Sequence, residues 1–171
     1  MSRLARLLAV AAAGLLVVQP LRVEAAKPGS NTIAEIVVAS TQASEPQFTL
    51  LLAALEYTGL TSTFTGKTPY TVFAPTDAAF VALLNDLQVN SLAAIDAKLG
   101  AGTVAKVLLY HVTRGVRLSQ SVVNAKQIEM VNGQKAAVNG ATIEGANIIG
   151  ADIRASNGVV HVIDKVILPT L

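Results

Sequence analysis

Residues 70–80, YTVFAPTDAAF, join an apolar, β-rich run to the start of a helix. A tight junction of this kind can hold a catalytic nucleophile or a phosphate. A nucleophile elbow needs a base and an oxyanion site beside it, and a phosphate loop needs glycine, which this stretch lacks. Pro75 ends the apolar run. We therefore predict that Thr76 caps the helix, for about 1 kcal/mol, and that Asp77 meets the positive end of the helix dipole.

The first half of the chain has helical patterns and the second half has strand patterns. Helices are predicted within residues 31–40, 45–60, 76–87, 91–100 and 102–112. Asn31 can cap the first of them, and Gly59 can end the second. Three Asn-Gly pairs follow, and each predicts a hairpin turn between short, mostly antiparallel strands. They stand at 132–133, 139–140 and 157–158. The expected fold class is α+β.

Residues 1–25 are typical of a secretory signal peptide. Two arginines precede an apolar run at residues 7–18, and Val23 and Ala25 fit a small-residue cleavage site. The run has twelve residues, whereas a membrane-spanning helix needs about 20. An uncleaved anchor is the alternative interpretation. We expect a leader at residues 26–30, no stable membrane span in the mature form, and a secreted or periplasmic location.

The charge balance argues against nucleic acid as a partner. The 171-residue sequence has 13 Lys and Arg and 11 Asp and Glu. Removing residues 1–25 takes away three arginines and one glutamate, which leaves ten basic and ten acidic side chains. No run of Lys or Arg remains that could follow a phosphate backbone. The chain has no cysteine, so disulfides, thiolate metal sites and cysteine nucleophiles are excluded.

The two histidines, His111 and His161, both stand in apolar surroundings. We expect buried imidazoles that are hydrogen-bonded to a neighbour such as a backbone carbonyl. A metal site would need a third ligand and a general base would need a nucleophile, and the spacing supplies neither. Asp164 is expected to bond backbone amides in a turn. We therefore predict no catalytic residue and no metal.

Three motifs occur in order: YTVFAPTDAAF early, LLYHVTRG in the middle and NGVVHVIDKVILP at the end. Together they closely resemble the fasciclin-like domain family, over residues 31–171. The resemblance implies a wedge of two β-sheets with a cluster of N-terminal helices. It also implies export, commonly a role in adhesion or matrix association, and no enzymatic activity.

The resemblance also suggests interaction residues. The Tyr-His motif and its apolar neighbours are implicated in cell adhesion in that family, which corresponds here to Tyr110, His111 and Leu109. Some animal members carry an Asp-Ile pair linked to receptor binding, which is similar to Asp152 and Ile153. The residues themselves allow other interpretations. Tyr110 can be a core residue with a bonded hydroxyl, and the pair can be an exposed Asp beside an inward Ile.

Three classes of function remain open at this point. The first is an exported, non-enzymatic adhesion module whose partner is an extracellular or cell-surface protein or polysaccharide. The second is a carrier of an apolar small molecule such as a carotenoid, because the chain is 52% hydrophobic. The third is an enzyme, which would require carboxylates such as Glu129, Glu144 and Asp164 to converge. We favour the first class and expect no other cofactor.

Overall fold

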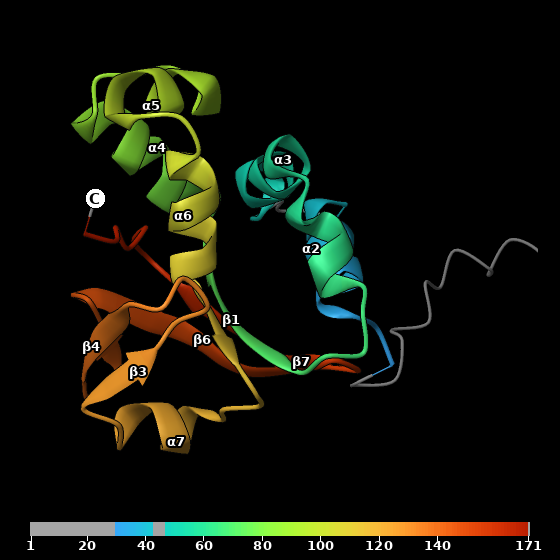
Figure 1. The fold of residues 1–171 in the computed structure, drawn as a ribbon. Coiled ribbons are helices and arrows are strands. Elements are labelled where there is room, and N and C mark those ends of the chain that lie inside the picture. The colour runs from blue at the N-terminus through green and yellow to red at the C-terminus, as the bar shows by residue number, and fades with distance from the viewer. Residues whose placement is uncertain (1–29, 43–46, 171) are drawn as a thin grey trace, which may run out of the picture.

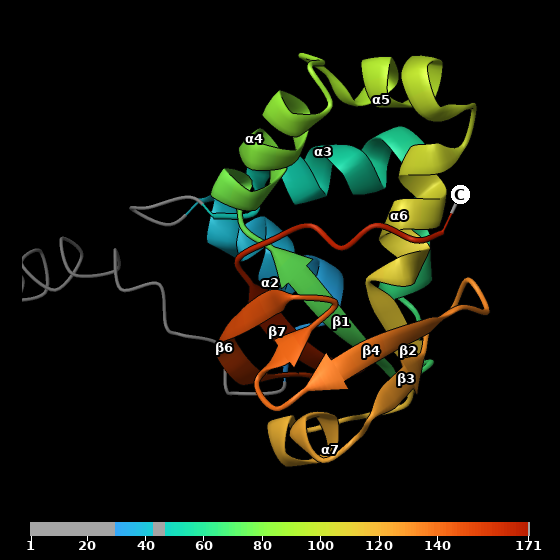
Figure 2. The same cartoon turned by 90° about the vertical axis from the view of Figure 1, so that its left-hand side faces the viewer.

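The computed structural model describes residues 30–42 and 47–170. The predicted signal peptide and nearly all of the predicted leader lie outside the described residues. Most helices come before most strands, as expected, but the short helix α7 (Ser119–Val123), which the sequence does not predict, lies between two strands (Figures 1 and 2). The helices are α2 (Ile33–Thr41), α3 (Thr49–Thr58), the 3-10 helix η1 (Leu60–Phe64), α4 (Asp77–Asp86), α5 (Leu92–Leu99), α6 (Thr103–Tyr110) and α7 (Ser119–Val123). The strands are β1 (Tyr70–Pro75), β2 (Val112–Arg114), β3 (Gln127–Glu129), β4 (Lys135–Asn139), β5 (Thr142–Ile143), β6 (Ala146–Ala155) and β7 (Gly158–Ile163).

The strands form one hydrogen-bonded series in the order β2-β1-β7-β6-β5-β4-β3. Only the β1–β7 pair is parallel among the described strands. The long strand β6 pairs with β5 at one end and with β7 along the rest, so it links the two expected sheets into a single series. The end strands approach each other, because the Val131 amide donates to the Val112 carbonyl over 2.8 Å. The α+β class is confirmed.

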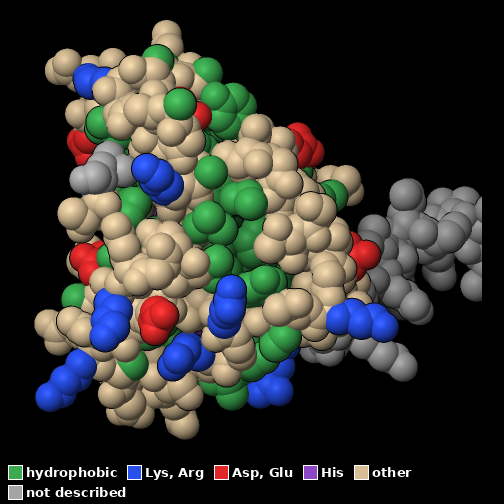
Figure 3. All heavy atoms as spheres, in the orientation of Figure 1, with side chains coloured by type: hydrophobic (Ala, Val, Ile, Leu, Met, Phe, Trp, Pro, Cys, Tyr) green, Lys and Arg blue, Asp and Glu red, His purple; other side chains and the backbone are tan. Residues whose placement is uncertain are grey.

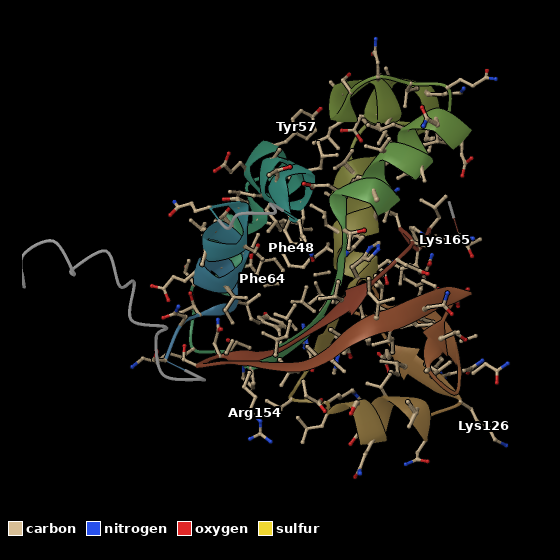
Figure 4. All side chains as sticks on the ribbon, turned by 180° about the vertical axis from the view of Figure 1, so that it is seen from behind. Phe48, Tyr57, Phe64, Lys126, Arg154 and Lys165 are labelled. Carbon is tan, nitrogen blue, oxygen red and sulfur yellow. The ribbon has the colours of Figure 1, made fainter. Side chains whose placement is uncertain are left out.

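Two apolar cores follow from this arrangement. The first lies between the sheet and helices α2 to α6, which gather on one side of it (Figure 1). Phe48 and Phe64 point into this core (Figure 4). The second lies within the series of strands and contains Phe73, Ile128 and Ile143, each no more than 1% exposed. No helix among the described residues is long and apolar enough to cross a membrane.

Side-chain caps explain where several helices begin and end. Thr32, rather than Asn31, caps α2, and it forms a capping box with Glu35. Gly59 ends α3 with a φ of +69°, as the sequence predicts. The Thr76 hydroxyl accepts from the Ala79 amide over 3.3 Å, so the predicted cap of α4 is confirmed.

Asp77 lies in the first turn of α4, as the sequence predicts, and its carboxylate also bonds the neighbouring helix. Its carboxylate accepts hydrogen bonds from the Thr49 hydroxyl and amide, over 2.5 and 3.2 Å, and from the Leu50 amide over 2.8 Å. The N-cap residue of α3, Phe48, makes no side-chain cap bond. Asp77 therefore caps the start of α3 from the start of α4, and fixes the two helices to each other.

An Asp77→Ala variant is expected to lose about 1–2 kcal/mol of the free energy of unfolding, because it removes the cap of a neighbouring helix. Urea denaturation measures this loss. Asp86→Ala removes an exposed carboxylate from the end of the same helix, and should change stability by less than about 0.5 kcal/mol. Equal effects of the two variants would contradict the cap.

Candidate interaction surface

The three motifs lie side by side in the sheet. Strand β1, from the first motif, pairs with β2 of the second motif on one side and with β7 of the third on the other. Figure 1 shows β1 running beside β7 beneath α6. Thr71 of β1 and His161 of β7 bond one surface segment that runs from the end of β2 to the start of α7. We name this segment, residues 114–119, the 114–119 loop.

Thr71 fixes the middle of the 114–119 loop. Its side chain is fully buried. The hydroxyl donates to the Gly115 carbonyl over 2.8 Å and accepts from the Arg117 amide over 2.8 Å. The Gly115 amide donates to the Pro69 carbonyl over 2.9 Å. A single buried hydroxyl thus satisfies two backbone groups of the loop.

His161 fixes the same segment from β7. The ring is fully buried and stacks on Phe73, with centroids 5.5 Å apart. Nε2 lies 2.8 Å from the Arg117 carbonyl, and Nδ1 lies 3.3 Å from the Asp152 amide. With these partners Nε2–H donates and Nδ1 accepts, so both ring nitrogens are occupied. The predicted buried, bonded imidazole is confirmed for His161.

Asp152 bonds the far end of the loop. It has a φ of +59° within an irregular part of β6. Its carboxylate is exposed and accepts from the Ser119 amide over 2.7 Å and from the Ser119 hydroxyl over 2.6 Å. These hydrogen bonds hold the pKa of Asp152 below its ordinary value. Ile153 beside it is 36% exposed, so the expectation of an inward Ile is wrong.

Tyr110 and His111 lie in the interior, at 4% and 2% exposure. The Tyr110 hydroxyl donates to the Lys135 carbonyl over 3.4 Å, and burial, followed by the charge of Glu144, raises the pKa of the phenol to about 12. Leu109 is half-buried. The expectation that Tyr110 and His111 contact a partner directly is wrong for the folded domain, because neither side chain lies at its surface.

His111 joins the end of α6 to the C-terminal segment. Its Nδ1 lies 2.7 Å from the Val107 carbonyl, and the Ile167 amide donates to Nε2 over 3.1 Å. Burial lowers the pKa of His111 from 6.5 to about 4, against the smaller opposite effect of the bond to Val107. The ring is therefore neutral at pH 7.

This pKa predicts a loss of stability in mild acid. The folded-state pKa lies below the unfolded value, so the unfolded chain takes up the proton first as the pH falls. The contribution of His111 is complete above pH 6.5 and is lost between pH 6.5 and 4, by about 3 kcal/mol. Urea unfolding at several pH values in that window measures it. A His111→Gln variant should lack this part of the pH dependence, and an equal slope in both proteins would refute the assignment.

The remaining motif side chains also bond within the fold. The Asp164 carboxylate accepts from the Asn147 amide over 2.8 Å and from its side-chain amide over 2.7 Å. A backbone amide is bonded, as predicted, but it belongs to β6 and not to a turn beside Asp164. Sequence reasoning missed Asn157, which is 4% exposed. Asn157 accepts from the Ile33 amide over 2.8 Å and donates to the Phe64 and Gly66 carbonyls over 2.6 and 2.9 Å.

The 114–119 loop lies at the surface, where Arg114 and Val116 are exposed, and two grooves border it. Val116, at its centre, is 57% exposed. One groove, of about 290 Å³, is lined by Val116 and Leu118 together with Lys67 and Arg154. The other, of about 390 Å³, is lined by Arg114 and Arg117 together with residues 129–131 and Gly133. The motifs thus position a surface loop between two basic grooves.

The described residues provide neither a metal site nor a large apolar cavity between the helices. No group of three or more His, Asp or Glu side chains in the described part of the chain is placed to hold a metal ion. An apolar crevice between α2, α3 and α6 is visible as hydrophobic side chains in the middle of Figure 3. Its cavity has about 10 Å³, roughly the room for a single water. In this conformation it is too small to hold a carotenoid.

Comparison with known proteins identifies the family. The Fasciclin domain model matches residues 46–169. The chain belongs to the fasciclin domain family. It is 34% identical over 152 residues to Protein sll1483 of Synechocystis sp., covering 86% of this chain and 79% of that protein. It is 35% identical over 128 residues to the transforming growth factor-beta-induced protein ig-h3 of Sus scrofa, covering 72% of this chain but 18% of that protein.

The fold has a counterpart among solved structures. The FAS1 domain pair from the insect cell adhesion molecule Fasciclin I superposes with a TM-score of 0.60 at 14% identity. The match covers 82% of this chain and 52% of the other. At this identity the likeness concerns the fold alone, and it agrees with the helices and mixed sheet of this fasciclin domain.

Proposed function

We propose that this chain is exported and that residues 31–171 form a non-enzymatic module that attaches to an extracellular or cell-surface protein or polysaccharide. The observation that supports this proposal most strongly is the structural role of the motif side chains. Thr71 and His161, which could take part in chemistry, are buried and bonded to the backbone of the 114–119 loop. The loop itself lies at the surface, bordered by two grooves. A surface that is held rigid in this way loses little entropy on binding.

Two further observations support the proposal. The insect protein with the same fold is a cell adhesion molecule. Residues 1–25 have the charge and hydropathy pattern of a secretory signal peptide. Of the interaction residues suggested by the sequence, Ile153 and Asp152 lie at the surface, and Asp152 acts by bonding Ser119.

Export and attachment are tested separately. Mass spectrometry of the protein outside the cytoplasm should give the mass of a chain that begins near residue 26, and recovery of only the uncleaved chain would contradict the signal peptide. The exported protein should then bind extracellular material from its source saturably. A Val116→Asp variant should bind it at least about tenfold more weakly, because it places a negative charge in the middle of the 114–119 loop, beside the basic side chains of the two grooves. Val81→Asp alters a side chain that is also exposed, at 48%, but lies on α4, and should bind normally.

A further inference from the structure

Charge is distributed unevenly between the two halves of the domain. The described residues up to 111 carry three basic and five acidic side chains, whereas residues 112–155 carry five basic and three acidic ones. Figure 3 shows Lys and Arg side chains gathered around an acidic one over the lower half of the molecule. Arg154 and Lys126 project from the same lower half in Figure 4. The sheet end of the domain is thus its anion-attracting end.

The larger groove lies at the seam where the two end strands of the sheet approach each other. The Thr113 hydroxyl donates to the Glu129 carbonyl over 2.7 Å, and the Val131 amide donates to the Val112 carbonyl over 2.8 Å. These bonds join β2 to the β3 segment. Arg114, at the end of β2, and Arg117 line the groove beside the seam together with Glu129.

Arg117 is fixed at its backbone and unsatisfied at its side chain. Its amide donates to Thr71 and its carbonyl accepts from His161, as described above. The guanidinium Nε is buried, and it has no hydrogen-bond partner among the described residues. A buried donor without a partner is unfavourable. Rotation of the Arg117 side chain toward an acceptor in the groove would relieve this, so the position favours a ligand that accepts hydrogen bonds.

The lining favours one chemical class of ligand. Arginine forks bind carboxylate and sulfate groups through two parallel hydrogen bonds. The Glu129 carboxylate can accept only, so it suits hydroxyl donors and repels a second anion placed beside it. Anionic groups spaced apart by hydroxyl-bearing rings match this pattern, whereas a continuous phosphate backbone does not.

We propose that the groove formed by Arg114, Arg117 and Glu129 binds an acidic polysaccharide, with a carboxylate or sulfate on the arginines and a sugar hydroxyl on Glu129. The proposal rests on the attachment function proposed above and specifies its ligand. One groove gives weak binding, and the repeating polymer supplies many equivalent sites along its length, so attachment to a surface that displays many copies becomes strong through avidity.

The test measures binding of the exported protein to alginate, dextran sulfate and neutral dextran. We expect binding to the two acidic polymers, weakening as salt is raised, and no binding to neutral dextran. Arg114→Gln/Arg117→Gln should reduce the affinity at least tenfold. Lys106→Gln/Lys165→Gln removes the same charge from exposed positions outside the groove, and should retain binding. If the Arg117 change impairs folding, the exposed Arg114→Gln alone should still weaken binding several-fold.

Equal binding to neutral dextran would overturn the inference, and so would equal losses in the groove and control variants. Binding to phosphatidylglycerol vesicles but to neither acidic polymer would also overturn it and would assign the basic end to a membrane. Binding of native extracellular material without binding of either acidic polymer would reject the ligand class and leave the attachment function standing. Failure to bind native material as well would reject both.

Discussion

A Gly158→Ala variant is expected to lose at least about 4 kcal/mol of the free energy of unfolding, or to fail to fold. A Cβ atom on residue 158 would lie 1.8 Å from the Tyr70 carbonyl oxygen and 3.0 Å from Ile33 Cδ1. The φ of +152° adds strain for any residue with a side chain. Because Gly158 pairs with Tyr70 at the start of the parallel β1–β7 ladder, the clash can be relieved only by separating β1 from β7.

The matched control is Gly133→Ala. Gly133 also has a positive φ, of +86°, but a Cβ there would meet nothing within 4 Å. That variant should lose only about 1–2 kcal/mol, the cost of the left-handed conformation. Thermal and urea unfolding of the two variants separate the clash from the backbone strain. Equal losses would show that close packing of β1 against Gly158 is not the decisive constraint.

An Asn157→Ala variant is expected to lose about 3–5 kcal/mol, because it leaves two buried backbone groups and one partly buried group without their partners. These groups belong to Ile33, Phe64 and Gly66. The side chain thereby bonds the start of α2 and the end of η1 to the turn before β7. Loss of the amide should loosen the contact between the N-terminal helices and the sheet as well as lower the overall stability.

Two further variants serve as comparisons for this prediction. Asn157→Asp keeps an acceptor for the Ile33 amide but replaces the donor to the two carbonyls, so it should remain strongly destabilised. Asn124→Ala removes an exposed amide that donates to the Gln120 carbonyl, and should cost less than about 1 kcal/mol. Urea unfolding compares all three. A small loss for Asn157→Ala would show that other groups or water replace its bonds.

Local signals in the sequence predict local structure well. The Thr76 cap, the end of α3 at Gly59 and the change from helices to strands follow from residues that are close in the chain. Asp77 shows the limit, because its partner Thr49 is 28 positions away. From the sequence, a carboxylate in the first turn of a helix is expected to stabilise that helix. Only the packing of α3 against α4 shows that Asp77 also caps α3.

The Asn157-Gly158 pair shows the same limit in the sheet. The pattern predicts a turn with both residues at its centre, but Ala155 pairs with Gly158, so the turn is Ser156-Asn157 and Gly158 belongs to the strand. The glycine is required by the approach of β1, 88 positions earlier in the chain, and the asparagine by backbone groups of α2 and η1. Neither contact leaves a signal in a single sequence.

The sequence does not predict the candidate surface, for a similar reason. The sequence motifs contain Tyr110, His111 and His161, which are all buried. The 114–119 loop that the motifs position is short and basic and has no recognisable sequence pattern. Arg117 stands out only in the structure, where its backbone amide and carbonyl are hydrogen-bonded to Thr71 and His161. Buried polar side chains that bond a loop make it rigid, and this links the sequence motifs to a surface suited to binding.

Amide hydrogen exchange in a Thr71→Val variant tests most directly whether the motif side chains serve to fix the 114–119 loop. The change keeps the shape of the side chain and removes the acceptor for the Arg117 amide. We predict that exchange at the Arg117 amide becomes at least about tenfold faster than in the wild type, while amides of the β1–β7 ladder keep their protection. Unchanged protection at Arg117 in a folded variant would contradict the account.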